Sequence, residues 1–107
     1  MPRAATTLDC FTAVAEPRRR AILDYLADDE RSVGEVVTAL RLRQPSVSKH
    51  LRVLSDVGLV SARRVGRTVL YRTNGAALRP PHEWAGTFER LWRHQLRRVK
   101  ERAEEGM

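Results

Sequence analysis

The spacing of apolar residues changes along the chain, and this change is the feature that most restricts its fold. Over most of the sequence they recur every three to four positions, which is typical of amphipathic helices. Between residues 59 and 73 they alternate, as in half-buried strands, and Gly66 divides this stretch into two. The sequence therefore predicts a mainly α-helical fold of about five to six helices with one small β-hairpin.

Helix start and stop signals divide the helical part into five segments. Pro17 suits a first helical turn, Ser32 with Glu35 forms a capping-box pattern, and Gly58 ends a helix. Asn74 to Pro81 is expected to be a linker. We expect a single domain over 1–107, with helices over 8–15, 17–28, 32–40, 44–57 and 82–104 and the hairpin over 59–73.

Length and composition exclude several classes of protein. The chain has 107 residues, which is enough for one small domain. No apolar run approaches the roughly 20 residues that a membrane span needs, and the start lacks the pattern of a signal peptide. The single cysteine, Cys10, excludes an intramolecular disulfide and a cysteine-rich metal cage. We therefore expect a cytoplasmic protein with no membrane partner.

The positive charge lies in one block. The net charge is +7, and residues 41–72 alone carry +7, against −2 for 1–40 and +2 for 73–107. Of the 20 basic residues, 18 are arginines. The base composition of the source genome explains arginine over lysine, but it does not explain the clustering. The block therefore predicts a polyanionic partner.

Two short helices joined by three residues and followed by a basic hairpin match a winged helix-turn-helix, with the hairpin as the wing. The helix over 44–57 has one aliphatic face and one polar face, and a helix fits the major groove of DNA. Arginines on the wing suit the backbone or the minor groove. The sequence therefore predicts binding to double-stranded DNA. The candidate DNA-binding residues are Arg43, Gln44, Ser46, Ser48, Lys49, Arg52, Arg63, Arg64 and Arg67.

These segments also resemble the ArsR/SmtB family of dimeric winged-helix repressors. The resemblance rests on residues 15–23 (AEPRRRAIL), 32–36 (SVGEV), 44–54 (QPSVSKHLRVL), 58–60 (GLV), 64–67 (RVGR) and Tyr71. It implies a homodimer that represses a promoter, often its own, with Gln44, Ser46, Ser48 and Lys49 facing the major groove. Residues 88–92 (FERLW) resemble the metal-independent branch of the family.

Arg43 departs from the family pattern, which has Ser or Thr at this position to cap the recognition helix. Losing the cap costs about 1 kcal/mol, and a cation is unfavourable at a helix N-terminus. A bound phosphate would relieve the unfavourable charge. Arg43 is therefore either a DNA contact or a solvated side chain, and the sequence leaves both open.

The sequence predicts neither a metal site nor a cofactor. The third helix contains no cysteine, and in the last helix Pro80 and Arg97 stand where the family's metal sensors have ligands. His50 is expected to face the packed side of its helix. Cys10 either packs in the core or oxidises across a dimer axis. A small-molecule effector stays unassigned.

Apolar and aromatic side chains on the first and last helices predict a homodimer, because so small a core cannot cover them. The alternative is that they fold back on their own domain. The candidate interface residues are Leu8, Phe11, Val14, Trp84, Phe88, Leu91, Trp92, Leu96 and Val99.

Other functions fit the sequence less well. An enzyme would need a nucleophile, a base and an orienting group, and no such spacing is visible. An RNA-binding protein would expose stacking aromatics. A metal- or thiol-responsive sensor and a winged-helix module for protein–protein contact remain as alternatives to the repressor.

Overall fold

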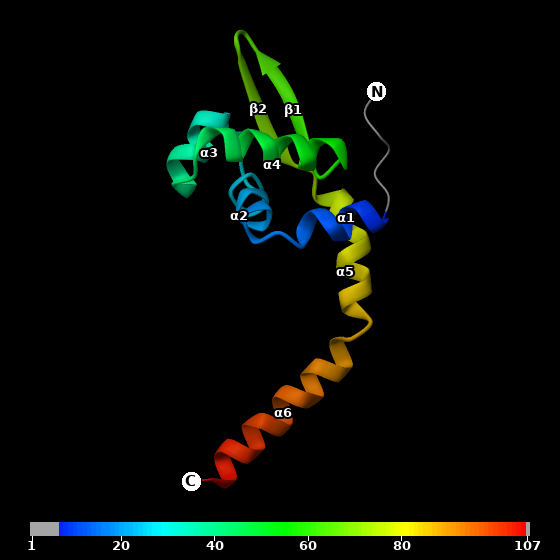
Figure 1. The fold of residues 1–107 in the computed structure, drawn as a ribbon. Coiled ribbons are helices and arrows are strands. Elements are labelled where there is room, and N and C mark those ends of the chain that lie inside the picture. Colours follow the sequence, from blue (N-terminus) through cyan, green and yellow to red (C-terminus); the bar gives the residue numbers. More distant parts are fainter. Residues whose placement is uncertain (1–6, 107) are drawn as a thin grey trace.

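The computed structural model describes residues 7–106, and side chains from Cys10 onward. Within these residues six α-helices, one short 3-10 helix and one two-stranded sheet follow each other along the chain (Figure 1). The fold is mainly helical with one hairpin, as the sequence predicted. The elements are α1 (Thr7–Val14), α2 (Pro17–Tyr25), α3 (Val33–Leu40), α4 (Gln44–Asp56), β1 (Val60–Val65), β2 (Thr68–Thr73), η1 (Gly75–Leu78), α5 (Arg79–Gly86) and α6 (Glu89–Glu105).

Local capping fixes where the early helices begin. Pro17 is the first residue of α2, and the Glu16 carboxylate accepts a hydrogen bond from the Arg19 backbone N–H at 3.1 Å. At α3 the capping box is complete: Ser32 Oγ accepts from the Glu35 N–H at 3.2 Å, and Glu35 Oε1 accepts from the Ser32 N–H at 3.0 Å. Helix α2 ends at Tyr25, three residues before the expected end, and the Leu26 carbonyl just beyond it accepts a hydrogen bond from the Thr73 backbone N–H at 3.1 Å.

The core lies where α1, α2, α3 and α4 meet the base of the hairpin. Its members are apolar and come from every one of these elements, so the core fixes how α3 and α4 sit together. The buried residues are Cys10, Ala13, Ile22, Leu23, Leu26, Val36, Val47, Leu51, Leu54, Leu59 and Val60.

The wing consists of β1 and β2, which pair antiparallel with Val65 opposite Thr68. The turn is therefore the two residues Gly66 and Arg67, and Gly66 takes a φ of +62° that favours glycine. A third segment joins the sheet, because the backbones of Arg31 and Tyr71 exchange two hydrogen bonds of 3.0 and 2.8 Å. The wing is thus tied to the loop between α2 and α3.

The C-terminal region differs from the expectation of a linker followed by one helix over 82–104. Residues 75–86 form η1 and α5, with Pro80 in the first turn of α5, where proline is tolerated. Helix α5 ends at Thr87, its C-cap, whose hydroxyl donates to the Trp84 carbonyl at 2.6 Å, and α6 follows from Glu89. Helix α6 extends away from the body, on the side opposite the wing, in a molecule that measures 61 × 30 × 21 Å (Figure 1).

Candidate nucleic-acid interface

Helix α4 divides into a buried and an exposed face. Val47, Leu51 and Leu54 are buried in the core, which fixes the rotation of the helix. Of the candidate DNA-binding residues on this helix, Ser46 is half-buried and the rest are exposed: Gln44, Ser48, Lys49 and Arg52. Small and cationic side chains are therefore free to meet a groove, while the aliphatic face is occupied.

The turn before α4 contains two arginines in different backbone conformations. Arg41 ends α3 with a φ of +54°, a left-handed conformation that non-glycine residues rarely adopt. Arg43 is the N-cap of α4, with a φ of −78° and no side-chain capping bond. Its side chain is exposed, so the first backbone N–H groups of α4 lack the usual side-chain partner.

The three candidate arginines of the wing are exposed, but they are not equivalent. Arg64 and Arg67 lie on the strand and in the turn. Arg63 forms a two-point ion pair with Glu30, with Nε and Nη2 donating at 3.0 and 2.9 Å. Sequence reasoning did not single out Glu30, because nothing local signals a contact across 33 positions.

His50 lies on the packed side of α4, as expected, and is 9% exposed. Arg19 Nε donates to His50 Nδ1 at 3.3 Å, and Arg19 Nη1 donates to the Ala13 carbonyl at 3.4 Å. Burial lowers the pKa of His50; Glu16 opposes this shift, and Arg19 and other nearby cations add to it. His50 therefore accepts a hydrogen bond in its neutral form and connects α4 to the end of α1.

The candidate interface residues are largely uncovered within one protomer. From Trp84 onward every one is exposed, from 44% for Phe88, which lies between α5 and α6, to 64% for Val99. Phe11 meets the Trp84 ring edge to face at 5.6 Å, and Val14 packs on the core. The backbone of Leu8 belongs to α1, but its side chain lies outside the described residues.

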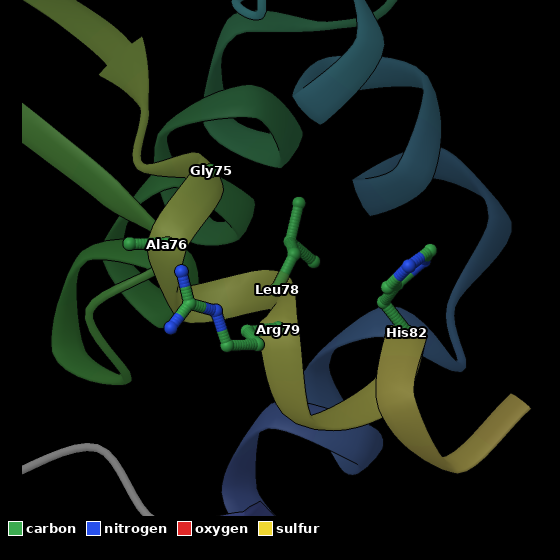
Figure 2. A pocket seen from close by; sticks show the side chains of 5 residues that line it. All are labelled: Gly75, Ala76, Leu78, Arg79 and His82. Atoms are coloured by element: carbon green, nitrogen blue, oxygen red, sulfur yellow. The ribbon is translucent and has the colours of Figure 1, made fainter. Parts of the chain in front are cut away.

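Two shallow hollows flank the start of α5. One, of about 520 Å³, is lined by Gly75, Ala76, Leu78, Arg79 and His82. In Figure 2 the Leu78 and His82 side chains point to the same side of the ribbon. The other, of about 400 Å³, shares these two residues and adds Val14, Arg20, Leu23, Asp24 and Pro81 from α1, α2 and α5. Neither contains a candidate DNA-binding residue.

Cys10 is a core residue, 3% exposed, and its thiol donates to the Ala77 carbonyl at 3.2 Å. Burial raises its pKa, which disfavours the reactive thiolate. Among the side chains that the structure describes, no group of three or more His, Cys, Asp or Glu is placed to hold a metal ion. Over the same part of the chain no helix is long and apolar enough to cross a membrane.

The packing of α3 against α4, followed by a basic wing, defines a winged helix-turn-helix protein. The family model of bacterial regulatory proteins of the arsR family matches residues 16–62. The HTH-type transcriptional repressor SmtB of Mycobacterium tuberculosis (strain H37Rv) is 48% identical over 64 residues, which are 60% of this chain and 47% of that protein. The chain thus spans about half the length of this relative.

Solved structures agree with this class. An ArsR-like transcriptional regulator from Rhodococcus sp. RHA1 superposes with a TM-score of 0.71 at 30% identity, over 92% of this chain and 90% of that one. The homodimeric winged helix-turn-helix DNA-binding domain of Mb0332 from Mycobacterium bovis superposes with a TM-score of 0.65 at 32% identity, over 77% and 79%. The chain belongs to the ArsR family of bacterial regulatory proteins.

Proposed function

We propose that the protein is a homodimeric transcriptional repressor that reads a palindromic operator, with residues 1–107 acting as one domain. The two faces of α4 carry this proposal: one is buried in the core, and the other presents Gln44, Ser48, Lys49 and Arg52 to solvent. The relative SmtB is named a transcriptional repressor. Repression follows physically if the dimer occupies DNA that the polymerase needs.

The candidate residues take different parts in this proposal. Gln44 suits a two-point contact with adenine, and Ser46 and Ser48 suit hydrogen bonds to bases or phosphates. Lys49 and Arg52 suit phosphate or guanine. The other arginines, Arg43, Arg63, Arg64 and Arg67, contact the backbone or the adjacent minor groove. Phosphate contacts supply affinity that depends on salt, and the base contacts of α4 supply sequence preference.

A second copy covers the apolar residues of α1, α5 and α6. The Mb0332 domain is described as homodimeric, and this chain has the same fold. The aromatic residues Trp84, Phe88 and Trp92 are 44–57% exposed in one protomer, more than a monomer of this size usually leaves open together. Two recognition helices about one turn of DNA apart then read the two halves of a palindrome.

The proposal places the protein in the metal-independent branch of the family, in the cytoplasm, with no catalytic role. The buried thiol of Cys10 and the arginine at position 97 argue against sensing by thiol or by metal on the last helix. The two hollows beside α5 are where an effector would be sought.

A fluorescence titration tests this function. The labelled probe is the DNA immediately upstream of the gene, measured with unlabelled competitor at two salt concentrations, with and without zinc. The expected result is binding that resists competitor and is unchanged by zinc. Binding to all sequences alike overturns the proposed operator recognition, and release of DNA by zinc overturns the metal-independent assignment.

A further inference from the structure

Glu30 holds one of the arginines of the wing by both carboxylate oxygens. Arg31 pairs with Tyr71, so these two side chains lie on one face of the sheet. Successive residues alternate between faces, so Glu30 and Arg72 lie together on the other face. Arg63 shares this face, since it is two residues along β1 from Ser61, the partner of Arg72. The carboxylate therefore reaches across β2 to the guanidinium.

The carboxylate occupies the atoms with which arginine binds phosphate. The Nε and Nη2 donors of Arg63 form the fork that matches either anion by two parallel hydrogen bonds. The pKa of the Glu30 carboxyl is lowered by these hydrogen bonds and by the charges of Arg63 and Arg72, so it is an anion at neutral pH. The Arg63 side chain is still 64% exposed, so a phosphate can reach it.

The wing does not depend on this ion pair for its position. The Arg31–Tyr71 backbone bonds hold β2 to the loop. Thr73 adds two more bonds, from Oγ1 to the Leu23 carbonyl at 2.7 Å and from N–H to the Leu26 carbonyl at 3.1 Å. Exposed ion pairs are weak and screened by salt, so a polyanion can open this one without moving the sheet.

We propose that Glu30 is an internal competitor of DNA for Arg63. In the free protein the carboxylate fills the guanidinium fork, and a DNA phosphate displaces it on binding. Glu30 thereby lowers the affinity for DNA, because breaking the ion pair offsets part of what the phosphate contact contributes. This inference rests on the proposed DNA-binding function and adds to it a residue that sets affinity without touching DNA.

Anisotropy titrations test the inference, with the upstream duplex and a random duplex of equal length at several salt concentrations. Glu30→Gln keeps the size of the side chain and removes its charge. It is expected to bind both duplexes about three- to tenfold more tightly than the wild type at low salt, because no ion pair has to be broken before Arg63 meets a phosphate. The control Asp28→Asn removes the same charge from an exposed carboxylate outside this ion pair, and it should gain clearly less affinity.

A double-mutant cycle ties the effect to Arg63. On an Arg63→Gln background, Glu30→Gln should change the affinity no more than Asp28→Asn does. Glu30→Ser, which is too short to reach Arg63, repeats the test should the glutamine variant fail to fold.

The outcomes distinguish a failure of the Glu30 inference from a failure of the proposed DNA-binding function. If Glu30→Gln binds no better than Asp28→Asn while the wild type binds, the ion pair is only a support and the inference is wrong. If the wild type binds neither duplex, the proposed function fails and the inference fails with it.

Discussion

Arg19 joins the end of α1 to the recognition helix through His50. Its Nε donates to His50 Nδ1 at 3.3 Å while its Nη1 donates to the Ala13 carbonyl at 3.4 Å. Nδ1 must be unprotonated to accept this bond. A protonated ring would lose it and would stand beside a guanidinium, so the charge state of His50 bears on how firmly α4 is held.

Acidification is therefore expected to lower the free energy of unfolding. Burial lowers the pKa of His50 below its ordinary value of 6.5. Between the lowered pKa and 6.5 the unfolded chain binds more protons than the folded one. The stability contributed by neutral His50 is complete above this window and is lost as the pH falls through it. Urea unfolding at about pH 7.5 and about pH 5.5 measures the loss.

His50→Gln is the matched variant, because its amide oxygen still accepts a hydrogen bond and does not titrate. Its unfolding free energy should change less between the two pH values than that of the wild type. An equal change in both proteins would show that other groups cause the pH dependence.

Arg41→Gly is expected to stabilise the protein by roughly 0.5–1 kcal/mol. Glycine relieves the left-handed strain at φ +54°, although it also gains freedom in the unfolded chain. Chemical denaturation measures the change. Arg43→Gly is the control, since Arg43 has an ordinary φ of −78° and gains no such relief. Equal effects of the two substitutions would mean that charge, not backbone strain, is responsible.

Trp92→Ala is expected to weaken self-association about thirtyfold or more, which corresponds to the roughly 2 kcal/mol of a central aromatic contact. Light scattering over a range of concentrations follows the shift towards monomer. Arg90→Ala removes an exposed side chain from the opposite face of the same helix, and it should leave association nearly unchanged. A Trp92→Ala protein that stays as tight a dimer as the wild type would remove α6 from the interface.

Lys49→Ala and Arg67→Ala should each weaken DNA binding and reduce the salt slope by about 0.9 if each neutralises one phosphate. The two residues lie on α4 and in the turn of the wing. Lys100→Ala removes the same charge from α6, outside the proposed DNA interface, and should leave the salt slope unchanged. Unchanged slopes in the first two variants would contradict the assignment of α4 and the wing to DNA.

The sequence predicts well what depends on neighbours along the chain. The capping box of Ser32 and Glu35 involves residues three apart, and Gly66 marks the turn that its own backbone requires. The stripe of Val47, Leu51 and Leu54 defines α4 because burial follows helical spacing.

The sequence did not predict one contact between distant segments and two local helix boundaries. Glu30 meets Arg63 only because the Arg31 backbone pairs with β2, and no local pattern signals that pairing. The break at Thr87 was missed because the helical spacing of apolar residues continues across it. The start of α5 was missed because proline is tolerated in the first turn of a helix and is equally typical of a linker.

Helix α6 contributes no buried residue to its own protomer, and the helix lies away from α4 and the wing (Figure 1). In the proposed dimer, the residues that select the partner subunit therefore lie in a different segment of the chain from the residues that select the operator. A duplicated copy in which Trp92, Leu96 and Val99 were replaced by a different self-complementary set would pair with itself and not with its parent, while reading the same DNA. A few substitutions on α6, far from the bound DNA, are then enough to prevent mixed dimers between two paralogous regulators.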